Sequence, residues 1–261
     1  MNVRTLKRVA IVASAALTAC HGFKLNRFPT NESLYTAAVS EFNKHHWGNA
    51  ATAFEKLTND LPARDTLLPR AYWFLAAAHD HQSEYLLSAQ SYTRLYESFP
   101  DDTLADDAAV QAARAYRRLW RKPTLDAGYG ETALATYSTA MGLYGPTMPV
   151  ALSDSVKREM AELDQWFATK NYETGLFYFR RKAYDSAILY FKYVLERWPG
   201  VPRAREALLR LAESYKAIRY REDLAETCTK LRSGYPGDRE ITQICGVTSA
   251  GGEVKPTPAK H

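Results

Sequence analysis

The chain has 261 residues, of which 46% are hydrophobic, and a formal net charge of +5. This length and apolar content are sufficient to bury a sizeable core. Residues 1–19 hold three basic and no acidic residues, so removing them lowers the charge of +5 by three, to +2. So small an excess gives no support for nucleic-acid binding. We expect no transmembrane segment apart from the N-terminal apolar run.

The N-terminus is typical of a bacterial lipoprotein precursor. Basic residues precede an apolar run over 9–19, whose 11 residues are too few to span a bilayer, since a span needs about 20. The run ends in Leu-Thr-Ala-Cys at 17–20, which matches a lipobox. We predict a signal peptide over 1–19 and fatty acyl chains, such as palmitate, on Cys20. The alternative is an ordinary signal peptide with an incidental cysteine. Because residue 21 is histidine and not the aspartate associated with inner-membrane retention, we expect the outer membrane as the destination.

Residues 20–31 should form a lipidated tether. The segment is polar, contains Pro29 and has no apolar periodicity. As a flexible chain it would reach roughly 20 Å, so the folded part should lie close to the membrane surface.

One side-chain spacing recurs along the rest of the chain. A small residue is followed by an aromatic four positions on, a branched aliphatic residue three further on, and a proline five beyond that. The three clear copies are Ala50, Phe54, Leu57, Pro62; Ser88, Tyr92, Leu95, Pro100; and Ala187, Phe191, Val194, Pro199. The spacing is a helical stripe that ends before a proline. Weaker copies end at Gly145 and Pro236, and marks of this type are typical of the tetratricopeptide repeat, whose period is about 34 residues. The sequence therefore predicts an all-α solenoid of tetratricopeptide-like helical hairpins, about five helix pairs or ten helices.

The positions of proline and glycine place these helices. The predicted pairs are 31–45 with 47–60, 67–82 with 84–98, 103–120 with 131–143, 153–181 with 184–197, and 202–218 with 221–233. A longer loop should cover 121–130, and the long fourth first helix should begin at a Ser153 or Asp154 cap. We divide the chain into N-terminal repeats 1–3 over 32–145, C-terminal repeats 4–5 over 146–236, and a mostly disordered tail over 237–261.

Two cysteines remain besides Cys20, an even number. Cys228 and Cys245 could form a disulfide in an oxidising compartment, if the segment from residue 239 folds back over the last helix. The alternative is two separate thiols, one of them buried.

No motif for catalysis is recognisable. The sequence has no glycine-rich phosphate loop, nucleophile elbow, paired-histidine zinc helix or Cys-x-x-Cys. The histidine clusters at 45–46 and 79–81 are better explained by packing at His79 and by solvation of the others at helix ends. We therefore expect no enzyme activity, no cofactor and no metal site.

The order of these elements resembles the BamD family of outer-membrane protein assembly lipoproteins, over about residues 20–236. The best local match is the run Tyr-Phe-Arg-Arg-Lys-Ala-Tyr at 178–184, continued by Phe-Lys-Tyr-Val-Leu-Glu-Arg-Trp-Pro at 191–199. The loop at 121–130 and the tail with Cys245 have no match in the family pattern. The resemblance implies binding to a BamA-type β-barrel insertase, other assembly lipoproteins and unfolded outer-membrane protein clients.

The resemblance also suggests where these partners bind. First helices of repeats line the concave side of such stacks, so a groove for client C-terminal segments, which commonly end in Phe, would use aromatic and basic residues of repeats 1–3: Tyr35, Phe42, Trp73, Arg114 and Arg117. The alternative is that the aromatics are covered by the next repeat and the arginines are solvated. The insertase would bind the C-terminal repeats, at Arg180, Arg181, Tyr190 and Lys192, unless these form only a solvated basic face.

Two other classes of protein remain open from the sequence. One is a periplasmic tetratricopeptide lipoprotein that coordinates cell division or peptidoglycan synthesis, although no preceding coiled coil is visible. The other is a lipoprotein hydrolase or metal-binding protein, which the absence of motifs disfavours.

Overall fold

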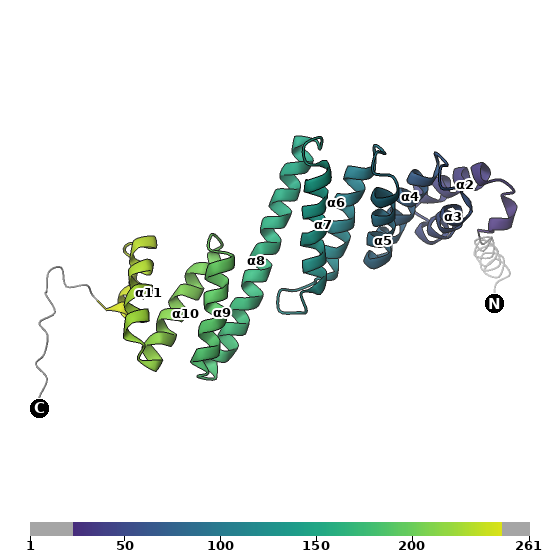
Figure 1. Cartoon of the computed structure of the whole chain (residues 1–261). Helices are drawn as coiled ribbons and strands as arrows, with labels where there is room; N and C mark the ends of the chain where they lie inside the picture. Colours follow the sequence, from purple (N-terminus) through teal and green to yellow (C-terminus); the bar gives the residue numbers. More distant parts are fainter. Residues whose placement is uncertain (1–22, 247–261) are drawn as a thin grey trace, which may run out of the picture. The chain divides into compact units, whose positions relative to one another are not determined.

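The computed structural model describes residues 23–246, which form helices and no strand (Figure 1). The elements are η1 (Leu25–Arg27), α2 (Asn31–Asn43), α3 (Trp47–Asp60), α4 (Leu68–His81), α5 (Tyr85–Ser98), α6 (Ala105–Leu119), α7 (Gly128–Tyr144), α8 (Val150–Arg180), α9 (Tyr184–Arg197), α10 (Pro202–Ile218), α11 (Arg221–Gly234) and α12 (Arg239–Cys245). The predicted fold class, a stack of helical hairpins, is confirmed. The chain divides into two compact units, Met1–Tyr116 and Arg117–His261, with α6 crossing the boundary. The functional division at residue 145 stays a prediction.

Each hairpin is closed by a short turn. Helices α2 and α3, α4 and α5, α8 and α9, and α10 and α11 pack against each other in pairs. In every one of these four turns, one residue other than glycine has a positive φ near 60°: His45, Ser83, Lys182 and Arg219. This left-handed conformation reverses the chain within a few residues. The same turn geometry therefore recurs in both units.

The core of the first unit is built from the repeat stripe. Ala50, Phe54 and Leu57 of α3 are fully buried and pack with residues of α2 and α4. The small residue permits close approach of a neighbouring helix, and the aromatic ring fills the space beside it. Phe54 stacks on Phe74 of α4 at 5.2 Å.

The segment before α2 is docked on this core. Phe23, Leu25 and Phe28 pack against it, and the rings of Phe23 and Phe28 stack at 5.4 Å. The expectation of a flexible tether is therefore wrong for residues 23–28. Three apolar side chains in six residues bury surface without any helical period, which a search for periodicity does not detect.

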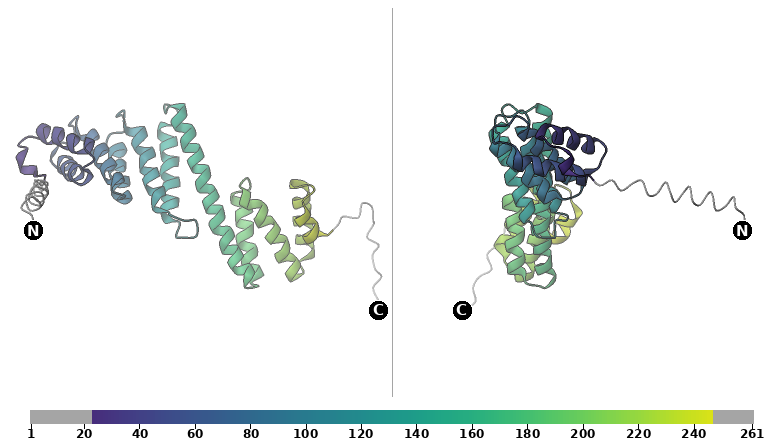
Figure 2. Two further views of the ribbon diagram at one scale, coloured as in Figure 1. Left: turned by 180° about the vertical axis from the view of Figure 1, so that it is seen from behind. Right: turned by 90° about the vertical axis from the view of Figure 1, so that its right-hand side faces the viewer.

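The second unit is organised around α8, which has 31 residues. Tyr137 of α7 is buried and donates to Glu159 in the first half of α8. The second half of α8 lies beside α9 (Figure 2), where a Cβ on Gly175 would come within 2.7 Å of the Phe191 ring. Gly175 thus permits the close helix approach that buries Phe191. Helix α8 is long because its first half packs against α7 and its second half packs against α9.

Two predicted boundaries in this unit are wrong. Helix α8 begins at Val150 because the Pro149 carbonyl accepts the Leu152 and Ser153 amides at 2.9 and 3.0 Å. Ser153 and Asp154 are therefore inside the helix and do not cap it. Helix α7 begins at Gly128, so the loop is shorter than the predicted 121–130. A Cβ on Gly130 would collide with the buried Trp120 ring, so this glycine allows the first turn of α7 to pack against Trp120.

The predicted tail over 237–261 begins with α12, a helix that the sequence analysis did not predict. Residues 247–261 lie outside the described residues. Within 23–246, no helix combines the length and apolarity needed to cross a membrane.

Candidate functional site

The predicted client groove contains two aromatics that pack between helices of the first unit. Tyr35 meets Phe54 and Phe74 edge-on at 5.9 and 6.5 Å. Phe42 meets Phe74 at 5.1 Å and Trp47 at 4.9 Å. Both are partly buried, so each ring supports the fold and leaves part of its surface for a ligand.

Trp73 has a different neighbour. Its ring meets Tyr92 of α5 edge-on at 5.2 Å, whereas Phe74, the next residue, is the ring that both Tyr35 and Phe42 contact. Adjacent helical residues differ by about 100° in direction. The sequence did not identify Phe74 as the residue that packs against Tyr35 and Phe42. A comparison of facing positions on α2 and α4 would have identified it.

The two predicted arginines have acidic neighbours. Arg114 lies near Asp107; burial and Asp106 raise the pKa of Asp107, and Arg114 opposes them. Arg117 belongs to the second unit, where it forms an ion pair with Glu162 of α8. A ligand carboxylate at Arg117 would have to compete with Glu162.

Two predicted insertase-binding residues, Arg180 and Arg181, lie at the turn between α8 and α9, and a third, Tyr190, lies in the middle of α9. Tyr190 stacks on Tyr178 at 5.6 Å, and Tyr178 meets Phe177 edge-on at 5.3 Å. The Arg181 guanidinium lies 3.5 Å from the centre of the Phe177 ring. Arg180 is exposed and is the last residue of α8. We call Phe177, Tyr178, Arg181 and Tyr190 the aromatic–arginine patch.

The local fold explains why this patch is presented at the surface. The Tyr178 carbonyl accepts the amides of Arg181 and Ala183 at 3.0 and 3.1 Å, which closes the turn. Gly175 brings α9 close enough for Tyr190 to reach Tyr178. Phe177 remains 48% exposed, so part of its ring stays accessible at the surface.

Lys192 does not belong to this patch. It lines a cavity of about 450 Å³ between α9, α10 and α11, which we call the C-terminal groove. The lining residues are Lys192, Leu195, Glu196, Leu208, Leu211, Tyr215, Asp223, Glu226, Thr227 and Lys230. A hydrogen bond with Tyr215 raises the pKa of Lys192, burial opposes this, and Asp223 adds to the increase. The sequence prediction thus combined two separate surfaces.

The histidine clusters pair with carboxylates and aromatic rings. His46 Nδ1 lies 2.9 Å from Glu41, and His79 Nδ1 lies 2.7 Å from Glu84. The His81 ring stacks on Trp47 at 4.0 Å. Between residues 23 and 246, no group of three or more His, Cys, Asp or Glu is arranged to hold a metal ion.

The cysteine pair that the sequence left open is joined: Cys228 and Cys245 form a disulfide, with Cα atoms 5.7 Å apart. Cys20, the predicted lipidation site, lies outside the described residues.

The helix hairpins and the surfaces on them define a tetratricopeptide-like repeat protein, a class that works by binding other proteins. The chain belongs to the outer membrane lipoprotein family YfiO, which it matches over residues 29–231. This result confirms the resemblance drawn from the repeats and from the run at 178–199.

Individual relatives agree with this family. The chain is 26% identical over 241 residues to the outer membrane protein assembly factor BamD of Caulobacter vibrioides, covering 88% of this chain and 76% of that protein. Among solved structures, a tetratricopeptide repeat protein from Parabacteroides merdae is 18% identical, covers 82% of this chain and 70% of its own, and has a TM-score of 0.36. A tetratricopeptide repeat protein from Thermus thermophilus is 19% identical, with coverages of 82% and 96% and a TM-score of 0.35. These scores are low, and the fold class rests on the helix packing described above.

Proposed function

We propose that this protein is an outer-membrane lipoprotein scaffold of the β-barrel assembly machinery, in which it binds a BamA-type insertase and the C-terminal segments of unfolded clients. The observation that supports this most is the family match over residues 29–231, together with the similarity to an assembly factor. Purification from detergent-solubilised outer membranes, followed by mass spectrometry, tests it. A co-purifying β-barrel protein with periplasmic repeats is the expected result, and murein synthases in its place would contradict the proposal.

For the insertase, the aromatic–arginine patch is the proposed contact. Aromatic and arginine side chains dominate binding energy at protein interfaces. Arg181 already lies over Phe177, so part of the ordering cost of the arginine is met before binding. An acidic side chain of the partner could then pair with Arg180 or Arg181 at the edge of an apolar contact.

A photo-crosslinking residue in place of Phe177 or Tyr190 tests this contact in cells. Tyr193 is the control, because it is an exposed tyrosine of the same helix (47%), one turn further along, and its ring meets Trp198 and not a ring of the patch. We expect insertase crosslinks from 177 and 190 and few from 193. If all three positions remain silent, the patch is not the contact.

For clients, the first unit offers the partly exposed rings of Tyr35, Phe42 and Trp73 and the cation of Arg114. A terminal phenylalanine would pack on a ring, and its carboxylate would pair with the arginine. Each contact would contribute on the order of 1–3 kcal/mol. Arg117 is left out of this proposed contact because it belongs to the second unit.

Binding of a peptide ending in phenylalanine, measured by fluorescence anisotropy, tests the client site. Arg114→Ala should weaken binding about tenfold, since the loss of one charged contact is worth roughly 1.4 kcal/mol. Arg64→Ala, an exposed arginine of the loop between α3 and α4, is the control and should bind normally. Equal affinities for both variants would exclude the site. Thermal unfolding of each variant separates lost binding from lost structure.

The proposed anchor is a set of acyl chains on Cys20 at the periplasmic face of the outer membrane. Each buried methylene contributes about 0.8 kcal/mol, and one chain binds only reversibly, so two or more are needed for stable anchoring. Mass spectrometry of the mature N-terminus should find the lipid, and Cys20→Ser should release the protein from membranes. Firm retention of that variant would identify protein contacts as the main anchor.

A further inference from the structure

Helix α12 occupies the place of a first helix in a further hairpin. It packs against both α11 and α10. In the same way α10 packs against α9 and α8, and α4 packs against α3 and α2. With only seven residues, α12 is a shortened counterpart of these helices and covers the last hairpin of the stack.

The cover is apolar on one side. Ile241 and Ile244 are 2% and 8% exposed and pack with Leu209, Ala212 and Leu231. A helix of two turns is unstable in water by itself, because nucleation costs more than so few hydrogen bonds return. Two isoleucines bury limited area, so α12 needs further restraints to remain in place.

Polar contacts supply some of these restraints. Asp238 caps the helix by accepting the Glu240 amide at 2.9 Å. At this N-terminal end, Arg205 of α10 forms ion pairs with Asp238 and with Glu240.

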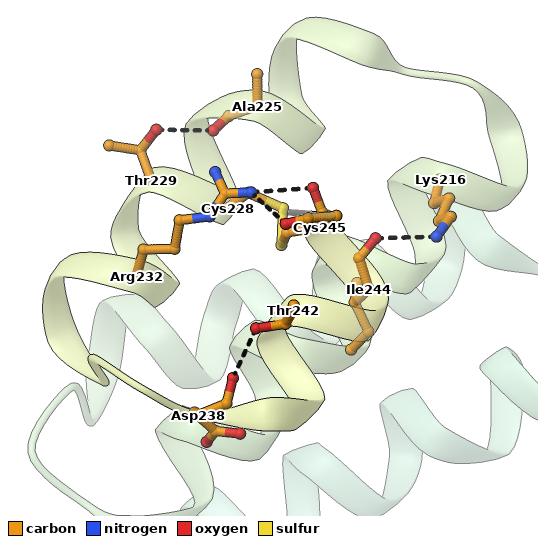
Figure 3. The surroundings of a disulfide bond; sticks show 10 residues. Lys216, Ala225, Cys228, Thr229, Arg232, Asp238, Thr242, Ile244 and Cys245 are labelled. Carbon is orange, nitrogen blue, oxygen red and sulfur yellow. Dashed lines mark hydrogen bonds between the residues drawn. A yellow bond between two sulfur atoms is a disulfide. The ribbon is translucent and has the colours of Figure 1, made fainter. Parts of the chain in front are cut away.

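At the other end of α12, cationic side chains meet the carbonyls that have no partner within the helix (Figure 3). Lys216 donates to the Ile244 carbonyl at 2.9 Å, and Arg232 donates to the Cys245 carbonyl at 3.0 Å. These contacts neutralise the negative end of the helix. They are partly solvated, however, and contacts of this kind contribute little individually.

The covalent restraint is the disulfide between Cys228 of α11 and Cys245, the last residue of α12. Cys228 is buried (3% exposed), whereas Cys245 is partly exposed. The bond closes a chain segment with a sequence separation of 17, so without it the unfolded segment gains considerable conformational freedom.

We propose that α12 is a redox-controlled cap: the Cys228–Cys245 bond holds it closed, and reduction of this bond by a dithiol, which itself becomes a disulfide, releases α12 from the end of the stack. The oxidant would be a thiol–disulfide oxidoreductase in its disulfide form, in the oxidising compartment that the proposed function implies. The partly exposed Cys245 thiolate attacks the disulfide of the oxidant and displaces one of its thiolates. The Cys228 thiolate then attacks the Cys245 sulfur and displaces the second. In sum, two thiols lose two electrons and two protons, and the oxidant becomes a dithiol.

Release of the cap would also change the order of the C-terminal groove. Leu208 and Leu224 pack against the core under α12 and also against the core between α9 and α10. Leu208 in addition lines the C-terminal groove together with Lys192. The oxidised cap therefore stabilises one wall of that groove, and the reduced protein has a less ordered groove.

Hydrogen exchange of the full mature chain tests the cap without reference to any binding partner, so its failure and that of the proposed function are distinguishable. Exchange is followed by mass spectrometry before and after reduction with a phosphine. We expect amides of 239–246 to exchange about 100-fold faster after reduction, with smaller increases in α11. Helix α3 is the internal control and should not change. Equal protection of α12 in the two states would overturn the proposal.

Two variants separate loss of the bond from loss of helix propensity. Cys245→Ser should exchange rapidly in α12 under both conditions. Gln243→Ser makes the same new residue at an exposed position of the same helix and should keep its response to reductant. A Gln243→Ser protein that behaves like Cys245→Ser would contradict a role for the disulfide.

Thiol trapping in cells tests the oxidant. The two cysteines should resist alkylation in normal cells and become alkylated in cells that lack envelope thiol–disulfide oxidoreductases. Cysteines that are free in normal cells would refute the cap in its proposed form. A disulfide that persists in the deficient cells would refute the assigned oxidant.

Discussion

At the N-terminal end of the described chain, residues 23–28 place three apolar side chains on the first core, two of them stacked rings. At the C-terminal end, α12 places two isoleucines on the last core and adds a disulfide, two ion pairs and two cation–carbonyl contacts. A repeat stack leaves an apolar surface at each end that must be covered. The comparison shows that a cover with large aromatic area can be non-covalent, whereas a small aliphatic cover is reinforced by a crosslink.

The largest expected effect comes from the repeat cores that these covers protect. Phe54→Ala and Phe191→Ala remove equivalent, fully buried rings from the first and second unit. Each should lower the free energy of unfolding by about 3–5 kcal/mol, measured by urea denaturation. A much smaller loss at one of them would mean that the corresponding hairpin is loosely packed and would weaken the comparison of the two ends.

The C-terminal cover should come next. Cys245→Ser should lower the free energy of unfolding by about 3 kcal/mol under oxidising conditions, because the open segment has more freedom in the unfolded state. Under reducing conditions the variant and the parent protein should have nearly the same stability. A difference that persists in reductant would indicate packing by the cysteine side chain and not the crosslink.

The N-terminal cover should be weaker but insensitive to redox conditions. Phe28→Ala removes one of the two stacked rings and should cost about 1–2 kcal/mol, the transfer free energy of a partly buried aromatic side chain. Denaturation curves in the presence and absence of reductant should show the same loss. Arg27→Ala, one residue earlier and exposed, is the control and should have little effect.

The smallest effect concerns the turn between α2 and α3 and depends on pH. The Asn49 amide donates to Glu41 at 2.7 Å and is the main cause that lowers the pKa of this carboxyl below 4.5; burial opposes it, and His46 lowers the pKa further. A lowered folded pKa means that this stabilisation is present above the unfolded pKa and is lost as pH falls through the folded pKa. Asn49→Ala should therefore cost about 1 kcal/mol at neutral pH.

The cost of Asn49→Ala should shrink as the pH falls through the lowered folded pKa of Glu41, because the carboxyl then becomes protonated in both proteins. Denaturation at neutral and acidic pH measures this change. A cost that is independent of pH would show that the amide acts through packing and not through the ionised carboxyl.

The sequence by itself determined the helices and their pairing. The small–aromatic–aliphatic stripe and the prolines identified the four hairpins that pack in pairs and the long α8, with most boundaries within a few residues, because these signals are local and follow from helix geometry. It also identified the family through the order of elements. The positions of Ser153 and Gly130 misled the boundary predictions, since a good capping residue and a glycine are both tolerated inside a helix that packs well.

Only the tertiary structure decided which neighbour each face meets. It separated Lys192 from Tyr190, although they are two positions apart on one helix, and it paired Arg117 with Glu162. It also turned Trp73 towards Tyr92, whereas the neighbouring Phe74 meets Tyr35 and Phe42. It also docked residues 23–28 and folded α12 under a disulfide. All of these depend on the register between helices that are distant in the sequence, and a 3.6-residue period specifies a face but not the surface that it contacts.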